Sequence, residues 1–121
     1  MSKETKKTNP MLRALIADLR KKAHENEAPI WRDIAERLEG PARNWPVVNL
    51  THISRYVHEK ETALVPGKVL STGKLTKKVS IVAWAFSEKA YEKIKKAGGK
   101  TFTIEQLVKQ NPKGKDVRIV G

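Results

Sequence analysis

The stretch that decides the fold is KKVSIVAWAF, residues 77–86. After its two lysines and one serine, this stretch holds only apolar residues rich in β-branched and aromatic types, which indicates a buried strand. Side chains alternate across a strand, so the apolar positions fall into two sets. The sets are Val79, Ile81, Ala83 and Ala85 on one side, and Val82, Trp84 and Phe86 on the other. We therefore expect layers that cover both faces of a sheet at this strand.

The residues around this strand continue an alternation of strands and helices. Upstream, residues 62–70 (TALVPGKVL) predict a strand that is broken at Pro66–Gly67. Downstream, Ser87 is expected to cap a helix that ends at Gly98–Gly99. Four residues of this helix are expected to point toward the core. These are Ala90, Tyr91, Ile94 and Ala97. A short strand at residues 101–102, a helix after Thr103 and a last strand at 116–120 complete the order strand, strand, helix, strand, helix, strand.

The N-terminal half predicts helices in place of strands. Apolar residues recur at helical spacing over residues 11–25, 29–39 and 50–58, whereas residues 41–48 are expected to be irregular because Trp45 precedes Pro46. The predicted fold class is α/β, with irregular strand-strand-helix layers and an N-terminal helical extension. Residues 1–8 form a basic arm in this interpretation. Residues 9–121 form a single domain, with a helical part at 9–60 and an α/β part at 61–121.

The charge of the chain favours a polyanionic partner. Its 121 residues include 25 Lys and Arg against 13 Asp and Glu, a formal net charge of +12. Such an excess is typical of proteins that bind nucleic acid, whose condensed counterions are released on binding. A surface built for solubility alone is better served by acidic residues. The net charge is +5 over residues 1–22, −1 over 23–60 and +8 over 61–121, so the basic surface is expected to be built from both ends.

Several classes of protein are disfavoured by the composition. The chain has no Cys, which argues against disulfides and thiolate metal sites and fits a reducing compartment. Residues 1–10 are polar and basic, so no secretory signal is expected, and no apolar run approaches the length that spans a bilayer. The three histidines lack metal-binding spacing, and GKVLSTGK departs from a phosphate-binding loop. We expect a non-catalytic cytosolic or nuclear protein without metal, cofactor or small-molecule substrate.

The candidate RNA-binding residues are basic side chains in flexible or irregular backbone and on helix flanks, where they can reach phosphates without disturbing the core. They are Lys3, Lys6 and Lys7 in the arm; Arg13 and Arg20 in the first helix; Arg43, Asn44 and Arg55; Lys68, Lys74, Lys77 and Lys78 near the central strands; and Lys113, Lys115 and Arg118 near the C-terminus. Trp45, beside Arg43 and Asn44, could pack over the helix junction or stack on a base.

Three separated stretches carry a resemblance to a known family. They are APIWRDIAERLEGPARNWPVVNLTHISRY (28–56), VPGKVLSTGKLTKKVSIVAWAFSEKAYEKIKKAGG (65–99) and NPKGKDVRIVG (111–121). Together they resemble the archaeal form of the large-subunit ribosomal protein eighteen family, which is related to bacterial large-subunit ribosomal protein fifteen. The resemblance covers the chain from about residue 8 to 121.

The resemblance implies a structural role in the cytoplasmic ribosome, bound to large-subunit ribosomal RNA and to neighbouring large-subunit proteins. It implies that basic motif positions face RNA. In this sequence they fall on Arg43, Asn44, Arg55, Lys68, Lys77, Lys78, Lys113, Lys115 and Arg118. Two alternatives remain open from the residues alone. One is a free-standing nucleic-acid-compacting or RNA-chaperone protein with a continuous basic face. The other is a small enzyme in which His52, His58 and Glu59 converge in a cleft.

Replacement of Lys77 and Lys78 by Ala tests the predicted turn before the central strand. If both lysines contact phosphates, the double variant binds RNA more weakly, and the slope of log K against log salt flattens by about one to two units. The fold is expected to survive. Filter binding over a salt series measures the slope, and an unchanged slope would remove this turn from the binding surface.

Overall fold

The central stretch forms strand β3 of a five-stranded sheet in the computed structural model, which describes residues 9–121. The elements in chain order are α1 (Pro10–Glu25), α2 (Pro29–Glu39), the short 3-10 helix η1 (Ala42–Asn44), β1 (Val47–Asn49), α3 (Leu50–Tyr56), β2 (Thr62–Leu70), β3 (Ser80–Phe86), α4 (Glu88–Lys96), β4 (Lys100–Phe102), α5 (Ile104–Gln110) and β5 (Val117–Ile119). The predicted α/β class is therefore confirmed, with the expected order of elements from residue 62 onward.

All strand pairs in the sheet are parallel, and β2 lies at its centre. One edge of β2 pairs along most of its length with β3, which in turn pairs with β4. The other edge is shared, because β5 pairs with the start of β2 at Thr62–Leu64 and β1 pairs with its end at Lys68–Leu70. Parallel strands need crossover connections, and α3, α4 and α5 supply three of them.

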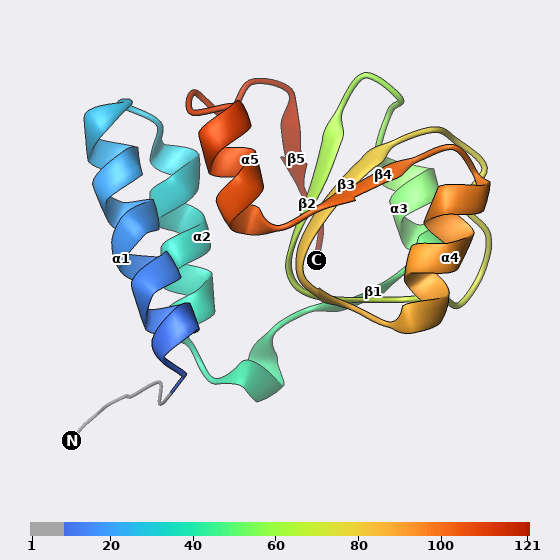
Figure 1. The fold of residues 1–121 in the computed structure, drawn as a ribbon, viewed down its shortest axis with the longest axis horizontal. Coiled ribbons are helices and arrows are strands. Elements are labelled where there is room, and N and C mark those ends of the chain that lie inside the picture. The colour runs from blue at the N-terminus through green and yellow to red at the C-terminus, as the bar shows by residue number, and fades with distance from the viewer. Residues whose placement is uncertain (1–8) are drawn as a thin grey trace.

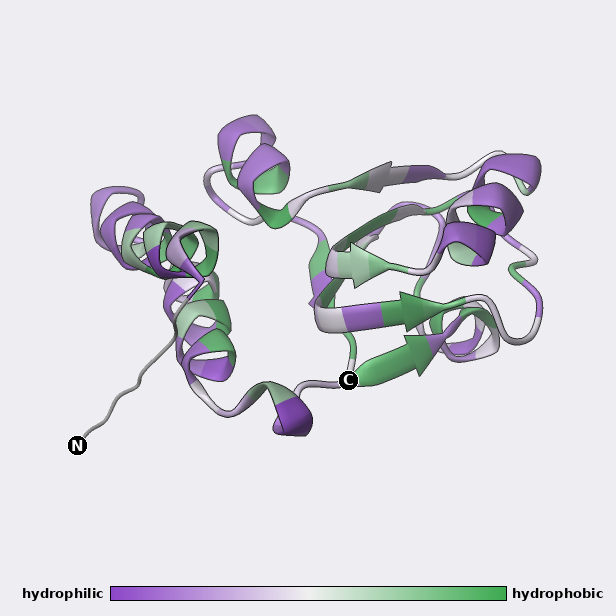
Figure 2. Cartoon of the chain, turned by 60° about the horizontal axis from the view of Figure 1, so that its bottom comes forward, coloured by the Kyte–Doolittle hydropathy of each residue, from purple (hydrophilic) through white to green (hydrophobic). Residues whose placement is uncertain are grey.

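Helices cover both faces of the sheet, as the apolar character of both sides of β3 predicts. Leu64 and Val82 belong to a core cluster with residues of α1, α2 and α5. Their neighbours Ala63 and Ile81 belong to a second cluster with residues of α3 and α4. Figure 1 shows α1, α2 and α5 on one side of the sheet and α3 and α4 on the other. Figure 2 shows hydrophilic residues along the outer faces of these helices.

Three differences from the sequence prediction concern β1, β2 and α4. Residues 47–49 form β1, although residues 41–48 were expected to be irregular, so the boundary expected at residue 60 does not separate a helical part from the sheet. The expected break at Pro66–Gly67 is a shift of register within a continuous β2, between Val65 and Lys68. Tyr91, expected to point inward, is 48% exposed on α4.

The N-terminal helices are tied to the rest of the protein by Trp31 of α2. This side chain is fully buried, and its Nε1 donates a hydrogen bond to the carbonyl oxygen of Pro112 at 2.7 Å. Pro112 lies in the loop that leads to β5. The helical extension is therefore fixed both by apolar packing against the sheet and by a hydrogen bond to the loop before β5.

Gly67 is the position where β2 permits the approach of the chain segment before β1. A Cβ atom at Gly67 would lie 2.1 Å from the carbonyl oxygen of Pro46, a backbone atom that cannot move without displacing β1. We predict that Gly67→Ala lowers the free energy of unfolding by about 1–3 kcal/mol. Urea unfolding followed by circular dichroism measures the change.

Gly40→Ala is the matched control, because its Cβ would meet no atom closer than 3.5 Å. It should leave the free energy of unfolding within about 0.5 kcal/mol of the parent, as surface substitutions usually do. Equal stability of the two variants would show that Pro46 does not constrain Gly67.

Candidate nucleic-acid interface

Four lysines line the end of the sheet at which the parallel strands begin. Val117, Thr62, Ser80 and Lys100 are in register across β5, β2, β3 and β4. Exposed lysines stand at or just before these positions. In strand order they are Lys115, Lys60, Lys78 and Lys100, and we call them the lysine row. Adjacent strands are spaced roughly 4.8 Å apart, so the row places its cations side by side along one end of the sheet.

The ammonium groups of the lysine row are available to an external partner. Within residues 9–121, none of the four Nζ atoms donates a hydrogen bond or joins an ion pair. Lys78 also lies along the backbone of Gly98, because a Cβ atom there would meet the Lys78 Cγ and Cε at 3.2 Å. Its alkyl stem is thus held against the turn before β4, while the charged end stays exposed.

A second basic site lies where α3 meets the loop after β2. The Thr51 hydroxyl accepts a hydrogen bond from the backbone of Lys74 at 3.1 Å. The Ser54 hydroxyl donates to the Lys74 carbonyl at 3.3 Å and accepts from Thr76 at 2.9 Å. These bonds fix the loop, so Lys74 and the neighbouring Arg55 of α3 are exposed cations on defined backbone.

Four of the predicted RNA-binding residues make intramolecular interactions. Lys77 Nζ donates to the carbonyl oxygen of Val57 at 3.1 Å, and Lys113 Nζ donates to that of Asn26 at 3.2 Å. Arg20 pairs with Glu39, and Arg118 with Glu61. Their side chains therefore stabilise the protein itself, and a Lys77→Ala change would remove an internal hydrogen bond as well as a charge.

The other predicted residues divide between exposed positions and undescribed ones. Exposed, and without a polar partner for the side chain inside residues 9–121, are Arg13, Arg43, Asn44, Arg55, Lys68, Lys74, Lys78 and Lys115. Lys3, Lys6 and Lys7 lie outside the described residues. Trp45 is partly buried and packs edge to face on Trp84, with ring centroids 6.1 Å apart, which favours the packing interpretation of that side chain over base stacking.

Sequence reasoning missed two members of the lysine row, Lys60 and Lys100. Each lies in an unremarkable polar stretch, and only the parallel register of the strands places both beside Lys78 and Lys115. The available signal was a lysine at or just before each predicted strand. That signal has meaning only if the strands are known to be parallel neighbours.

Arg118 and the turn before β2 hold Glu61 in its ionised form. Arg118 Nε donates to both carboxylate oxygens of Glu61 at 3.1 Å, and the backbone N–H of His58 donates to Oε1 at 2.9 Å. Both interactions favour the carboxylate, so the pKa of Glu61 lies below its ordinary value of 4.5. The pair joins β5 to the start of β2, next to the lysine row.

Two classes of site are missing from the described part of the chain. No group of three or more metal-binding side chains gathers anywhere in residues 9–121. None of the helices described there is long and apolar enough to cross a membrane. His52, His58 and Glu59, which the enzyme alternative requires to converge, do not line the cavity between β3 and β4.

The ion pair of Glu61 predicts a dependence of stability on pH. A carboxyl group with a lowered pKa in the folded state adds stability above its unfolded value, about 4.5, and this stability is lost as the pH falls through the folded pKa. Arg118→Gln should therefore lower stability at pH 7 and lose less on acidification below pH 4.5 than the parent does. Urea unfolding from pH 3 to 7 tests this, with Glu61→Gln as the variant that lacks the titrating group. Parallel stability curves for the parent and Arg118→Gln would contradict it.

Comparison with known proteins identifies relatives across the whole chain. A family model described as "Ribosomal protein 60S L18 and 50S L18e" matches residues 1–120. The large ribosomal subunit protein eL18 of Methanoregula boonei is 53% identical over 120 residues, which cover 99% of each chain. Its counterpart from Methanothermobacter thermautotrophicus is 47% identical with the same coverage. That from Archaeoglobus fulgidus is 47% identical over 95% of this chain and 98% of its own. The chain therefore belongs to the family of ribosomal proteins 60S L18 and 50S L18e, as its archaeal resemblance predicts.

Proposed function

We propose that this protein is a structural, non-catalytic component of the large ribosomal subunit that binds ribosomal RNA through separate basic sites on a rigid α/β body. Family membership supports the ribosomal role and the cytoplasmic location that goes with it. The observation that supports this mode of RNA binding is the lysine row, whose four exposed cations lie at the end of the parallel sheet where the strands begin.

The proposed contacts extend beyond the lysine row. Arg55 and Lys74 form a second site at α3, and Arg13, Arg43, Asn44 and Lys68 are further exposed candidates. Lys6 and Lys7 of the N-terminal arm remain proposed contacts from sequence alone. The four residues with intramolecular partners, Arg20, Lys77, Lys113 and Arg118, have a weaker claim, because RNA would have to share or displace those partners. Neighbouring large-subunit proteins are proposed as further partners.

A rigid arrangement of separate basic sites suits folded RNA better than an extended duplex. Phosphate contacts position a protein without reading sequence, and several such contacts at fixed spacing select the shape of the RNA. A free-standing compacting protein would bind duplex DNA equally well. Competition between duplex DNA and large-subunit ribosomal RNA for the purified protein separates these two functions.

Replacement of Lys78 and Lys100 by Gln tests the lysine row directly. Each lost phosphate contact reduces the slope of log K against log salt by roughly 0.7 to 0.9, so the double variant should show a slope flatter by about 1.5 units. Filter binding of large-subunit ribosomal RNA over a salt series gives both the affinity and the slope.

The matched control is the double variant Arg32→Gln and Arg37→Gln, which removes the same formal charge from α2. Both arginines already pair with acidic residues of their own helix, Glu36 and Asp33. The control should keep the parent slope. If both double variants flatten the slope equally, net charge and not the lysine row determines binding.

Sedimentation of cell extract through a sucrose gradient tests the ribosomal role itself. The native protein should run with large subunits at moderate salt. Recovery of the protein at the top of the gradient, apart from the subunits, would contradict the proposed function.

A further inference from the structure

The opposite end of the sheet, where the strands finish, contains a crevice between β3 and β4. These neighbouring strands lead into helices on opposite faces, because α4 after β3 packs with one core cluster and α5 after β4 packs with the other. In open α/β sheets, ligands bind outside the carboxyl ends of the strands at such a switch point. Here β4 pairs with β3 only through Ser80–Val82, so residues 83–86 of β3 continue past the end of β4.

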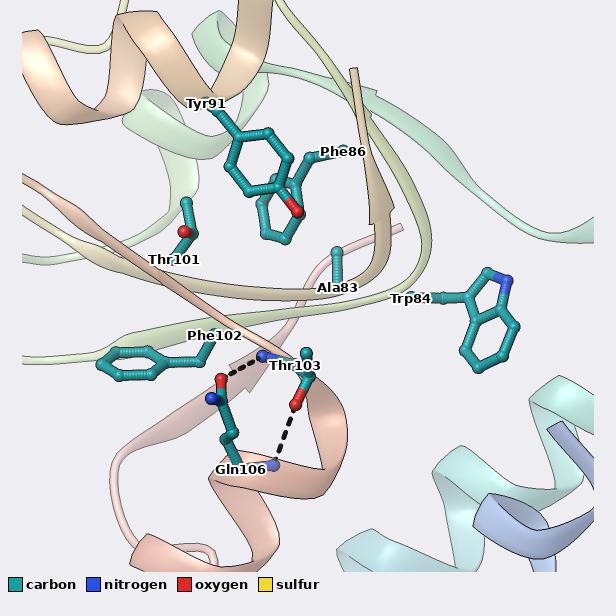
Figure 3. Close-up of a pocket in the computed structure, with 8 residues that line it drawn as sticks. All are labelled: Ala83, Trp84, Phe86, Tyr91, Thr101, Phe102, Thr103 and Gln106. Atoms are coloured by element: carbon teal, nitrogen blue, oxygen red, sulfur yellow. Dashed lines mark hydrogen bonds between the residues drawn. The ribbon is translucent and has the colours of Figure 1, made fainter. Parts of the chain in front are cut away.

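A cavity of about 160 Å³ occupies this crevice. Its lining comes from the ends of β3 and β4 and from both following helices, with Tyr91 on α4 and Gln106 on α5 (Figure 3). Because four consecutive elements contribute, the cavity is a feature of the topology and not of a single loop.

Aromatic rings are concentrated in the crevice. The chain has only four Tyr and Phe residues, and three of them, Phe86, Tyr91 and Phe102, line the cavity. Phe86 and Tyr91 form a tilted pair with centroids 4.9 Å apart, and Tyr91 keeps 48% of its surface exposed. Trp84 also lines the cavity, but its ring points away from Tyr91 and Phe102 (Figure 3). That ring packs edge to face against Trp45.

Polar groups in the crevice complement the rings. Gln106 Oε1 accepts a hydrogen bond from the Thr103 backbone at 2.9 Å, which fixes the carboxamide and leaves its Nε2 as a donor. The hydroxyl of Thr101 lies on the Tyr91 side of the cavity (Figure 3). A planar ring with polar edges matches this combination of an exposed aromatic face and uncharged hydrogen-bonding groups.

The charge beside the crevice favours a nucleic acid. Lys95 follows Tyr91 by four residues on α4 and therefore lies on the same face of that helix. It is exposed and has no ion-pair partner among residues 9–121. A base stacked on Tyr91 would place its own phosphate within reach of this cation.

We propose that the crevice between β3 and β4 binds one unpaired RNA base, which stacks on Tyr91 and receives a hydrogen bond from Gln106. This inference rests on the proposed RNA-binding function and adds a base-binding site to its phosphate contacts. Recognition of unstacked bases by aromatic side chains is a common mode of RNA binding. A strand from a neighbouring protein, added to the free edge of β3, is the competing occupant.

Three variants test the stacking contact with large-subunit ribosomal RNA as the probe. Tyr91→Leu keeps apolar bulk but removes the ring and should weaken binding about 5- to 140-fold, the range expected for one stacked base. Tyr91→Phe keeps the ring and should bind as the parent does. Tyr56→Leu, which changes the other exposed tyrosine of the chain, should also bind as the parent does. Circular dichroism establishes that each variant is folded.

The salt dependence separates failure of this inference from failure of the proposed function. Tyr91→Leu should leave the salt slope unchanged, since it removes no phosphate contact. If the parent binds RNA with a steep salt slope and Tyr91→Leu binds equally well, the base site is excluded while the proposed function stands. If the parent itself does not bind, the proposed function fails.

Photo-cross-linking of intact subunits with thiouridine-substituted RNA identifies the occupant. RNA cross-links to peptides that contain Tyr91 or Phe102 are expected. Cross-links of these peptides to a neighbouring protein in place of RNA would overturn the proposal.

Discussion

The backbone pairing of β2 is the constraint on which the structure depends. This strand is buried over most of its length and pairs with β3 on one edge and with both β1 and β5 on the other. Buried backbone groups must be paired, so the strand fixes the three that surround it. The close approach of Pro46 to Gly67 guides the chain into β1, where Lys68 N–H donates to the Pro46 carbonyl at 3.0 Å.

A parallel sheet sorts the chemistry of this chain to two ends. The starts of the strands lie at one end of the sheet, which brings together lysines that are up to 55 residues apart in sequence, such as Lys60 and Lys115. Strand ends gather at the other, where Phe86, Tyr91 and Phe102 line the crevice. The lysine row and the proposed base site are thus separated by the length of the sheet. An RNA that uses both sites must extend around the protein, which agrees with the proposed binding of folded RNA through several separate sites.

Local patterns predicted what depends on local physics. The side-chain alternation of residues 79–84 and the cap at Ser87 follow from neighbouring residues, and both are present. Phe86, expected on the side of Val82 and Trp84, packs instead against the cluster that holds Ala63 and Ile81. The strand β1 was missed, because three residues after a proline carry too little pattern and their pairing with β2 is set 21 residues away. Parallel register was not predicted either, so the lysine row was found only in part, through Lys78 and Lys115. The individual RNA contacts remain predictions.

The intramolecular partners of the lysines separate two effects that net charge combines. Lys77, Lys93 and Lys113 donate to backbone carbonyls of loops and so act as fixed links within the protein. Their charge still adds to the long-range field that attracts a polyanion. In the proposed function, contact with phosphate falls to cations that have no internal partner, and a linked lysine can hold the backbone beside such a cation. Lys93, for example, bonds to two carbonyls of residues 71–73, directly before the exposed Lys74. The basic residues therefore divide between those whose side chains bond within the protein and those that we propose as RNA contacts.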